Sequence, residues 1–454
     1  MPTKIARLLA VLLAFMLVAA ACGGDDDDGD GDGDDASGET ETDGDGSGEA
    51  EEIDYEAIGL WDDGPCDESL EPLHVGMMTA FETPVLSLED QAFALEAAAT
   101  AFNERGGANG ACIEVTTCDD QATLDQAVSC VRDIDEAGVH ATINDQGSIG
   151  QAEVSQAMAD AGIPRIASNV TQDDWDDENA YPLDASGTGV TFLMPQALLD
   201  QGITQQGLIR VDLAEFSVFV DLLGGLYPEV DIVADIPVPA GTTDYSQFIL
   251  GAEDRGAEGV SLPLGEQEAV QVINAAQQLG TDLPIGSSLG SFSHSSVAGF
   301  GDFADQMIFV WSFAPATFDI PVYDALRADL AASGEDSLQP ENLKASPMRS
   351  WIGLYATLEM IRDQNVTEFT RENMTAMLRA AEDVPMLDMF GGADWTPDRN
   401  SEGLWSRAGI DTWSTYRWDP AASFNGESGN FVRDGEISFD AVLCGSPFGP
   451  PEPC

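Results

Sequence analysis

Positive charge is scarce in this chain of 454 residues. It has 17 lysines and arginines against 82 aspartates and glutamates, for a formal net charge of −65, and Lys4 and Lys344 are its only lysines. So negative a surface repels phosphate groups, which makes nucleic acid and anionic membrane surfaces poor partners of the folded part. The excess of acid fits adaptation to salt or simple solubility, and the sequence favours neither.

The usual arrangements of catalytic and metal-binding residues are also missing. The only histidines, His74, His140 and His294, are scattered, and no two cysteines form a C-x-x-C pair. No G-x-S-x-G, H-E-x-x-H or P-loop motif occurs. We therefore expect no metal site, no cofactor and no catalytic residues, and an exported enzyme is the disfavoured alternative.

Only one long hydrophobic run occurs, from Leu8 to Ala21, behind two basic residues. It is shorter than the roughly 20 residues that a membrane-spanning helix needs. It ends in small residues before Cys22, which predicts a lipoprotein signal peptide over residues 1–21, cleavage before Cys22 and lipidation of its thiol. The alternative is an ordinary signal peptide that leaves a free cysteine. Either signal exports the protein.

The next segment, residues 22–54, consists mainly of Asp, Glu, Gly, Ser and Thr. Such a segment cannot bury enough apolar surface to offset the entropy lost on ordering, so we expect a disordered acidic tether. Repulsion between its like charges extends it. It is expected to join a lipid anchor to a folded head.

Cysteine usage fits an oxidising compartment. Six cysteines follow Cys22, an even number, and disulfides are the expected use. A disulfide that closes the short loop between Cys118 and Cys130 contributes about 3 kcal/mol to stability in the chain-entropy model. The predicted pairs, the first of them assigned by elimination, are Cys66 with Cys112, Cys118 with Cys130, and Cys444 with Cys454.

Strand-like apolar runs then alternate with helical patterns, as in parallel doubly wound sheets. The first helix is expected behind a capping box at Ser87 and ends at Gly106. Predicted strands cover residues 72–78, 112–117, 139–143, 163–167, 206–211, 231–238, 259–263, 284–287 and 307–313. Further predicted helices cover residues 123–137, 151–161, 216–226, 245–255, 267–279, 322–332, 348–363 and 371–381. Two α/β units in series, followed by helices, predict two lobes with a return to the first.

Four motifs in order resemble one known family. They are Ala101-Phe-Asn-Glu-Arg-Gly-Gly-Ala-Asn-Gly, Cys118-Asp-Asp-Gln, Ala161-Gly-Ile-Pro-Arg-Ile-Ala-Ser and Val238-Pro-Ala-Gly-Thr-Thr-Asp-Tyr. Over residues 72–395 the chain resembles the type I periplasmic binding proteins of the branched-chain amino acid (leucine, isoleucine and valine) group. The resemblance implies an α/β fold with two lobes, each a doubly wound, mainly parallel sheet. It also implies three crossovers, a ligand in the cleft between the lobes, hinge closure and delivery to an ABC permease.

The expected division of the chain follows from these features. Residues 1–21 form the signal peptide and 22–54 the tether. The first lobe is expected from 55–190 and 317–400, and the second from 191–316. Residues 401–454 are expected to form an irregular extension near the hinge.

Ligand contacts in the first lobe are expected in the loops that follow its third and fourth strands, because ligands bind beyond the carboxyl ends of parallel strands. These loops are 144–148 and 168–171. The resemblance assigns hydroxyl donors to Ser148 and Thr171 and backbone contacts to Asn169 and Val170. The alternative is that the two hydroxyls only cap helices.

The second lobe departs from the family pattern. The matching positions are Phe216, Gly265 or Glu266, and Leu289, so the carboxylate that receives a substrate ammonium group is missing from its usual place. Glu266 is the candidate replacement, or alternatively an exposed acid at a helix start. An α-amino acid substrate is therefore in doubt, and amides, urea-like compounds, aromatic acids and other small polar organics remain open.

The tail is rich in tryptophan, and its four indoles either pack in the core or form a lip of the cleft: Trp395, Trp405, Trp413 and Trp418. Core packing is the expected role. The function predicted is capture of a small polar solute, an amino acid or an amide-like compound, by a monomer anchored through lipid to the outer face of the cytoplasmic membrane. The alternative is a surface receptor of the same fold that signals to a membrane partner.

Overall fold

Residues 53–81, 83, 87–145, 151–168, 177–212, 216–399 and 407–444 are described by a computed structural model of the chain. They contain two separate β-sheets, which we call the sheets of lobe 1 and lobe 2. All of them belong to one compact unit that begins at Ile53. No helix in these ranges is both long and apolar enough to cross a membrane.

The lobe 1 sheet has the strand order β2-β1-β3-β4-β5, and every pairing in it is parallel. Its interior strand β1 is buried at six of seven positions, as expected of a strand covered on both faces. The strands are β1 (Leu73–Thr79), β2 (Ile113–Asp119), β3 (Ala141–Ile143), β4 (Arg165–Ile166) and β5 (Ala180–Tyr181).

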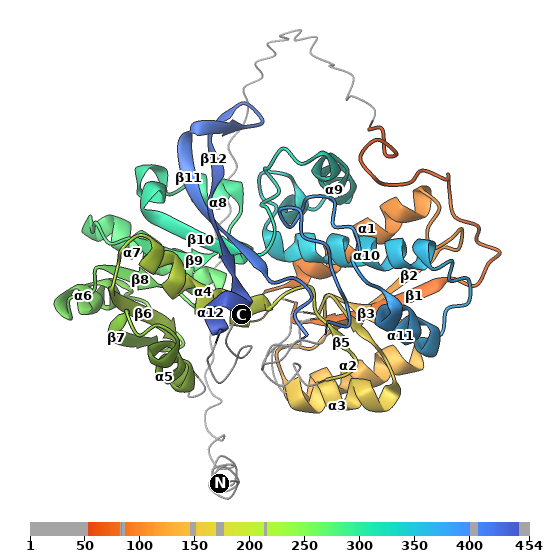
Figure 1. Cartoon of the computed structure of the whole chain (residues 1–454), viewed down its shortest axis with the longest axis horizontal. Helices are drawn as coiled ribbons and strands as arrows, with labels where there is room; N and C mark the ends of the chain where they lie inside the picture. The colour runs from red at the N-terminus through yellow and green to blue at the C-terminus, as the bar shows by residue number, and fades with distance from the viewer. Residues whose placement is uncertain are drawn as a thin grey trace, which may run out of the picture. The chain divides into compact units, whose positions relative to one another are not determined.

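Helices cover both faces of this sheet. Figure 1 shows α1 and α10 on one face and α2 and α3 on the other. The helices α9, α10 and α11 come from the later part of the chain, as the predicted return to the first lobe requires. Their bounds are α1 (Glu89–Glu104), α2 (Leu124–Glu136), α3 (Gln151–Ala161), α9 (Pro321–Ala331), α10 (Ala345–Asp363) and α11 (Arg371–Ala380).

The start of α1 differs from the prediction. The helix begins at Glu89, and Leu88 at its N-cap makes no side-chain capping bond. The Leu88 N–H instead donates to the Ala80 carbonyl at 3.0 Å, so Ser87 and Leu88 belong to the loop after β1. The capping box expected at Ser87 is therefore wrong.

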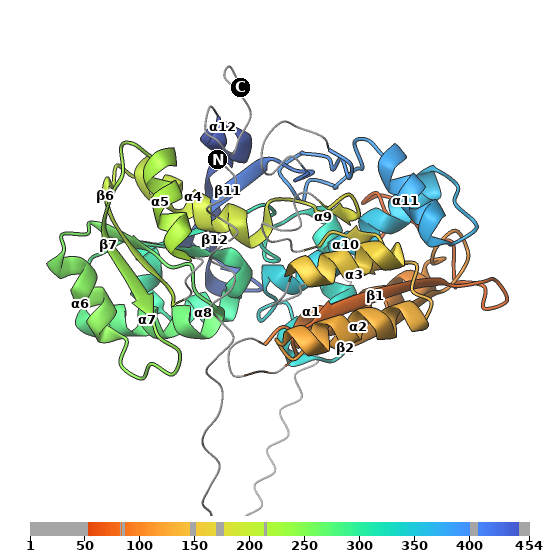
Figure 2. The same ribbon diagram turned by 90° about the horizontal axis from the view of Figure 1, so that it is seen from below.

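The lobe 2 sheet has the order β12-β11-β10-β9-β8-β6-β7, parallel from β10 to β7 and antiparallel at β11 and β12. In Figure 2, α4 and α5 lie on one face of this sheet and α6 and α7 on the other. The strands are β6 (Gln205–Val211), β7 (Asp231–Val238), β8 (Gly259–Ser261), β9 (Ile285–Ser288), β10 (Met307–Trp311), β11 (Thr412–Phe424) and β12 (Glu427–Ser438). The helices are α4 (Ser186–Asp200), α5 (Phe216–Leu226), α6 (Ser246–Asp254), α7 (Glu266–Leu279), α8 (His294–Ala298) and α12 (Phe439–Leu443).

The tail was predicted to be irregular, but its described part is regular. β11 and β12 form a long hairpin that extends the lobe 2 sheet next to β10. Its turn is Asn425-Gly426, whose φ angles of 51° and 84° are the left-handed values that a tight hairpin turn needs. The side chains of Trp395, Trp413 and Trp418 are buried, which confirms core packing for these three; Trp405 lies outside the described residues.

Three crossovers join the lobes, as the resemblance implied. They connect β5 to α4, β10 to α9, and α11 to β11. Backbone bonds hold them side by side: Ile410 N–H donates to the Leu183 carbonyl at 2.7 Å, and Ala314 N–H donates to the Met389 carbonyl at 2.9 Å. The observed architecture confirms the predicted α/β fold with two lobes.

Candidate functional site

The carboxyl ends of the parallel strands mark the candidate site, because ligands of open α/β sheets bind there. In lobe 1, the turn after β3 begins at Asn144 and the turn after β4 at Ala167, with left-handed φ angles of 51° and 52°. In lobe 2, Glu266 begins α7 after β8, and Leu289 directly follows β9. These positions follow the carboxyl ends of the strands, where the sequence predicted ligand contacts.

Asn144 ties the end of β3 to two helices. Its Nδ2 donates to Gln91 Oε1 of α1 at 3.1 Å and to Ser350 Oγ of α10 at 2.9 Å. The Ser350 hydroxyl in turn donates to the Gln91 carbonyl at 2.8 Å. The Asn144 Oδ1 is buried without a hydrogen-bond partner in the described structure. Only this oxygen of the amide is therefore left to accept from a ligand or a water.

Several predicted residues lie outside the described part of the chain: Ser148, Asn169, Val170, Thr171, Cys22 and Cys454. Phe216 is the first residue of α5, but its side chain is not described. Ser168, two residues after the end of β4 and directly before the predicted Asn169, is fully buried, and its hydroxyl has no partner among the described residues. Such a buried hydroxyl costs free energy unless a ligand or water satisfies it.

The two other predicted contacts of lobe 2, Glu266 and Leu289, lie close to the N-terminal end of α10 in lobe 1. The Glu266 side chain is 43% exposed, and its Oε2 accepts from Lys344 Nζ at 3.0 Å. Leu289 is buried, and the carbonyl of the following Gly290 accepts from Ser346 Oγ of α10 at 2.9 Å. Both positions are thus next to contacts with the N-terminal end of α10.

Lys344 is the N-cap residue of α10 and contacts both lobes. Its Nζ lies 2.8 Å from Asp90 Oδ2 in the first turn of α1 and 3.0 Å from Glu266 Oε2 at the start of α7. Burial alone would lower the pKa of Lys344, but the two carboxylates outweigh it, so the pKa lies above its ordinary value. The ammonium group is therefore charged at any physiological pH.

A second polar link lies at the crossovers. Asp184, between β5 and α4, accepts from Arg349 Nη2 of α10 at 2.9 and 2.8 Å and also from the Ser312 hydroxyl after β10. Both charged side chains are buried, and Arg349 Nη1 has no partner in the described residues. The Arg349 Cζ also lies 5.7 Å from the ring centroid of Trp311. This cluster joins two crossovers to lobe 1.

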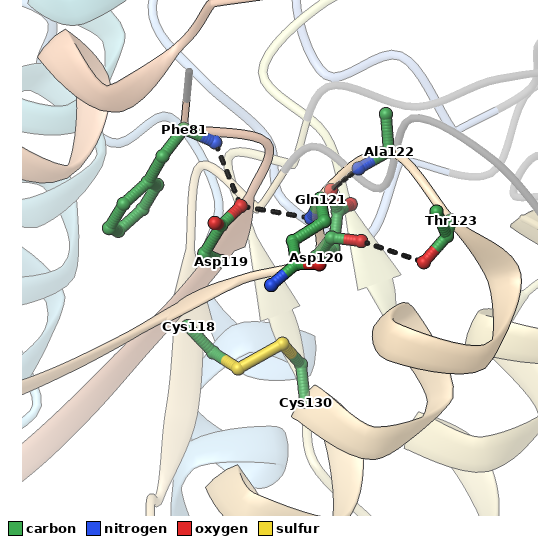
Figure 3. Close-up of a disulfide and its surroundings, with 8 residues drawn as sticks. All are labelled: Phe81, Cys118, Asp119, Asp120, Gln121, Ala122, Thr123 and Cys130. Carbon is green, nitrogen blue, oxygen red and sulfur yellow. Dashed lines mark hydrogen bonds between the residues drawn. A yellow bond between two sulfur atoms is a disulfide. The ribbon is translucent and has the colours of Figure 1, made fainter. Parts of the chain in front are cut away.

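A tight loop follows the carboxyl end of β2 in lobe 1 (Figure 3). The Asp119 carboxylate accepts from the backbone N–H of Phe81 at 3.0 Å and of Gln121 at 2.9 Å. The Cys118–Cys130 disulfide joins the end of β2 to α2 directly beneath this loop. It and the Cys66–Cys112 disulfide are the pairs predicted from the sequence; the pairing of Cys444 with Cys454 stays a prediction.

Two surface grooves lie away from these strand ends. One, of about 510 Å³, runs between α4, the end of α5 and α12 in lobe 2. The other, of about 390 Å³, lies between α1 and α9 in lobe 1. Neither contains a predicted ligand contact. No cluster of His, Cys, Asp or Glu able to hold a metal occurs within the described ranges.

Sequence reasoning missed Lys344, Asp90, Asp184 and Arg349 as residues of the interlobe region. One signal was available for Lys344: it is the only lysine after the predicted signal peptide, in a chain with 82 acidic residues. No comparable signal marked Asp184 or Arg349, because neither residue type is unusual and their pairing joins distant segments.

Residues 72–404 match the model of a protein family described as periplasmic binding protein. No curated protein sequence is detectably similar to the chain.

Solved structures share the fold at low sequence identity. One is a fatty acid ABC transporter substrate-binding protein from Thermomonospora curvata, with 14% identity, a TM-score of 0.67, and coverage of 84% of this chain and 95% of that chain. Another is a solute-binding protein of an ABC transporter from R. palustris in complex with 4-hydroxybenzoate, with 13% identity, a TM-score of 0.64, and coverage of 81% and 97%. A third is an ABC transporter substrate-binding protein from Sphaerobacter thermophilus, with 17% identity, a TM-score of 0.63, and coverage of 81% and 98%.

Proposed function

Because the chain belongs to the periplasmic binding protein family, we propose that it captures a small organic solute between its two lobes and delivers it to an ABC permease in the membrane. The family match is the observation that carries this proposal. Two features of the structure support it: the carboxyl ends of parallel strands in both sheets bear buried polar groups, and three crossovers join the lobes. This arrangement suits a cleft that closes around its ligand.

Apart from Glu266, which is paired with Lys344, the proposed contacts are those that the resemblance assigned. Lobe 1 would hold the solute through backbone and hydroxyl groups, and lobe 2 would cover it with apolar and aromatic side chains. The residues proposed for these roles are Ser148, Asn169, Val170, Thr171, Phe216 and Leu289. Ser168, with its unsatisfied buried hydroxyl, joins them as a candidate.

The finer class of solute is also a proposal. The sequence predicted an amino acid or an amide-like compound, with Glu266 as the acceptor of an ammonium group. Glu266 is already paired with Lys344, so a solute ammonium would have to compete with a lysine that is 17% exposed. This pair favours a solute without an ammonium group, either an amide or a carboxylic acid. Complexes such as that of the R. palustris protein with 4-hydroxybenzoate agree with an acid.

Export and anchoring complete the proposal. We infer that Cys22 is lipidated after cleavage and holds the protein, as a monomer, on the outer face of the cytoplasmic membrane. The two disulfides support an oxidising compartment. A Cys22→Ala variant should then leave the membrane fraction, and unchanged membrane association would rule out the anchor.

A thermal-shift screen tests the binding function. The purified protein is heated with amino acids, amides, aromatic acids, fatty acids and sugars, each in separate wells. A ligand present at about 100 times its Kd stabilises the folded state by about 2.7 kcal/mol, which raises the Tm by a few degrees. A hit among amides or acids supports the proposed class. A hit only among amino acids restores an ammonium-bearing solute, and the absence of any hit across these classes argues against solute binding.

A further inference from the structure

Lys344 contacts lobe 2 although it belongs to lobe 1. It precedes α10, which packs on α1 in lobe 1, and its first partner, Asp90, lies in the first turn of α1. Its second partner, Glu266, is the first residue of α7 in lobe 2. The ammonium group is therefore shared between one carboxylate of its own lobe and one of the other lobe.

The position of this cation points to a role beyond helix formation. A lysine at the N-cap of α10 faces the positive end of that helix dipole, which is unfavourable by itself. Asp90 and Glu266, in contrast, each lie in the first turn of a helix, where a negative charge is favourable. The two acids thus offset the placement of Lys344, and the three helix starts are held together around one charge.

A lysine suits a contact that has to form and break. Its ammonium is a compact point charge on a flexible stem, whereas arginine favours a fixed planar pairing. Lys344 can therefore keep Asp90, whose side chain is 10% exposed, while it releases Glu266, whose side chain is 43% exposed. The more exposed partner is the one that belongs to the other lobe.

Given the proposed function, we propose that Lys344 is a latch: it holds the two lobes together through Glu266 and at the same time keeps Glu266 from receiving an ammonium group of the solute. Asp90 positions the lysine for this contact. Arg349, five residues further along, lies about 7.5 Å away along α10 at 1.5 Å per residue and binds Asp184 in the crossover region. The latch is thus close to the crossovers and lies at the carboxyl ends of the strands. Separation of the lobes therefore moves Glu266 away from Lys344.

A second contact reinforces the latch. Ser346, in the first turn of α10, donates to the Gly290 carbonyl of lobe 2 at 2.9 Å. Gly290 has no space for a larger residue, because a Cβ there would lie 2.4 Å from the Trp311 ring. A Cβ on Gly290 would also lie 3.1 Å from Ser346 Oγ, so the lack of a side chain at Gly290 lets the N-terminal end of α10 approach lobe 2.

Single-molecule energy transfer between the lobes tests the latch without any solute. Dyes are attached in the full chain at two exposed residues, Glu136 on α2 of lobe 1 and Gln278 on α7 of lobe 2. In Glu266→Gln, which removes only the interlobe half of the latch, we expect the ratio of closed to open molecules to fall by about two- to fivefold, or about 0.4 to 1 kcal/mol for a partly exposed pair. High salt should produce a similar fall in the wild type and little change in the variant.

Two controls separate the latch from a general loss of stability. Arg362→Gln removes an ion pair with Asp63 that is also partly exposed but lies within lobe 1, so it should leave the ratio of closed to open molecules unchanged. Lys344→Arg keeps the charge and should retain part of the closed population. An unchanged ratio in Glu266→Gln, with an unchanged Tm, overturns the latch.

Solute specificity provides an independent second readout. Lys344→Gln frees the Glu266 carboxylate, so the variant should gain thermal shifts with amines and amino acids that the wild type lacks. If Glu266→Gln leaves the ratio of closed to open molecules unchanged while the wild type binds a solute, the latch is rejected and the proposed function stands. An intact latch with no solute bound by any variant would reject the proposed function alone.

Discussion

Arg349 and Asp184 form a buried ion pair that links α10 of lobe 1 to the first crossover. The Nη2 of Arg349 lies 2.9 and 2.8 Å from the two carboxylate oxygens of Asp184, and their side chains are 2% and 0% exposed. Asp184 also accepts from the Ser186 N–H at 2.7 Å at the start of α4. One carboxylate therefore fixes the end of one lobe and the start of the other.

Removal of Arg349 should destabilise the protein strongly. Arg349→Met leaves the Asp184 carboxylate buried without its counter-charge, and we expect a loss of about 3 to 5 kcal/mol in the free energy of unfolding measured in urea. Arg417→Met serves as the control, because its pair with Asp434 is about one-third exposed on both sides and should contribute less than about 1 kcal/mol. Equal losses in the two variants would contradict a special role for the buried pair.

The two disulfides should contribute unequally. Cys118 and Cys130 are separated by 12 residues and Cys66 and Cys112 by 46, so the second bridge closes the longer loop. In the chain-entropy model, the paired serine substitutions should cost about 3 kcal/mol for the short loop and about 4 kcal/mol for the long one. Denaturant unfolding of the two double variants measures both values. A larger loss from the short loop would show that lost packing around the buried Cys130, and not chain entropy, decides the effect.

Acid should weaken the folded state through His140. Its Nδ1 accepts the backbone N–H of His74 at 3.1 Å, which requires an unprotonated nitrogen. Burial, with smaller effects from His74 and Arg371, lowers the pKa of His140 below its ordinary value of 6.5. The unfolded chain therefore binds a proton at His140 more readily than the folded one. The contribution of His140 to the stability is complete above about pH 6.5 and is lost as the pH falls.

The His140→Asn variant isolates this effect. An asparagine Oδ1 offers an acceptor near the position of Nδ1 but does not titrate, so the variant should lose less stability than the wild type between pH 7.5 and pH 5 on the measured scale of unfolding free energy. The other acidic groups titrate alike in both proteins and cancel in the difference. Parallel curves for the two proteins would show that His140 does not control the acid response.

Most elements of both lobes could be predicted from the sequence because they depend on local patterns. The predicted strand at residues 231–238 and the predicted helix at 371–381, for example, match β7 and α11 within one residue. One of the elements that were not predicted has a clear physical cause. The helix α4 was not predicted because almost all its residues from Gly189 to Leu198 are buried and it contains Pro195, so it lacks an amphipathic period. The hairpin of the tail was missed although Asn425-Gly426 is a strong hairpin signal.

The candidate site was only partly accessible to sequence reasoning. The turns at Asn144 and Ala167 follow from the alternation of strands and helices, so their place at the carboxyl ends of β3 and β4 was predictable. The partners of Asn144 were not, because Gln91 and Ser350 come from helices that precede and follow it by long stretches of chain. The same reasoning applies to Glu266: the sequence marked it as a candidate but contained no information on what its carboxylate would bind.

The sequence by itself determined the α/β class, the two lobes and the excess of negative charge, because apolar periodicity, turn residues and composition are properties of short segments. Only the tertiary structure decided that the tail completes the lobe 2 sheet and that Lys344 joins Asp90 to Glu266. These contacts depend on distances between segments far apart in the chain, and such distances exist only after both lobes have packed.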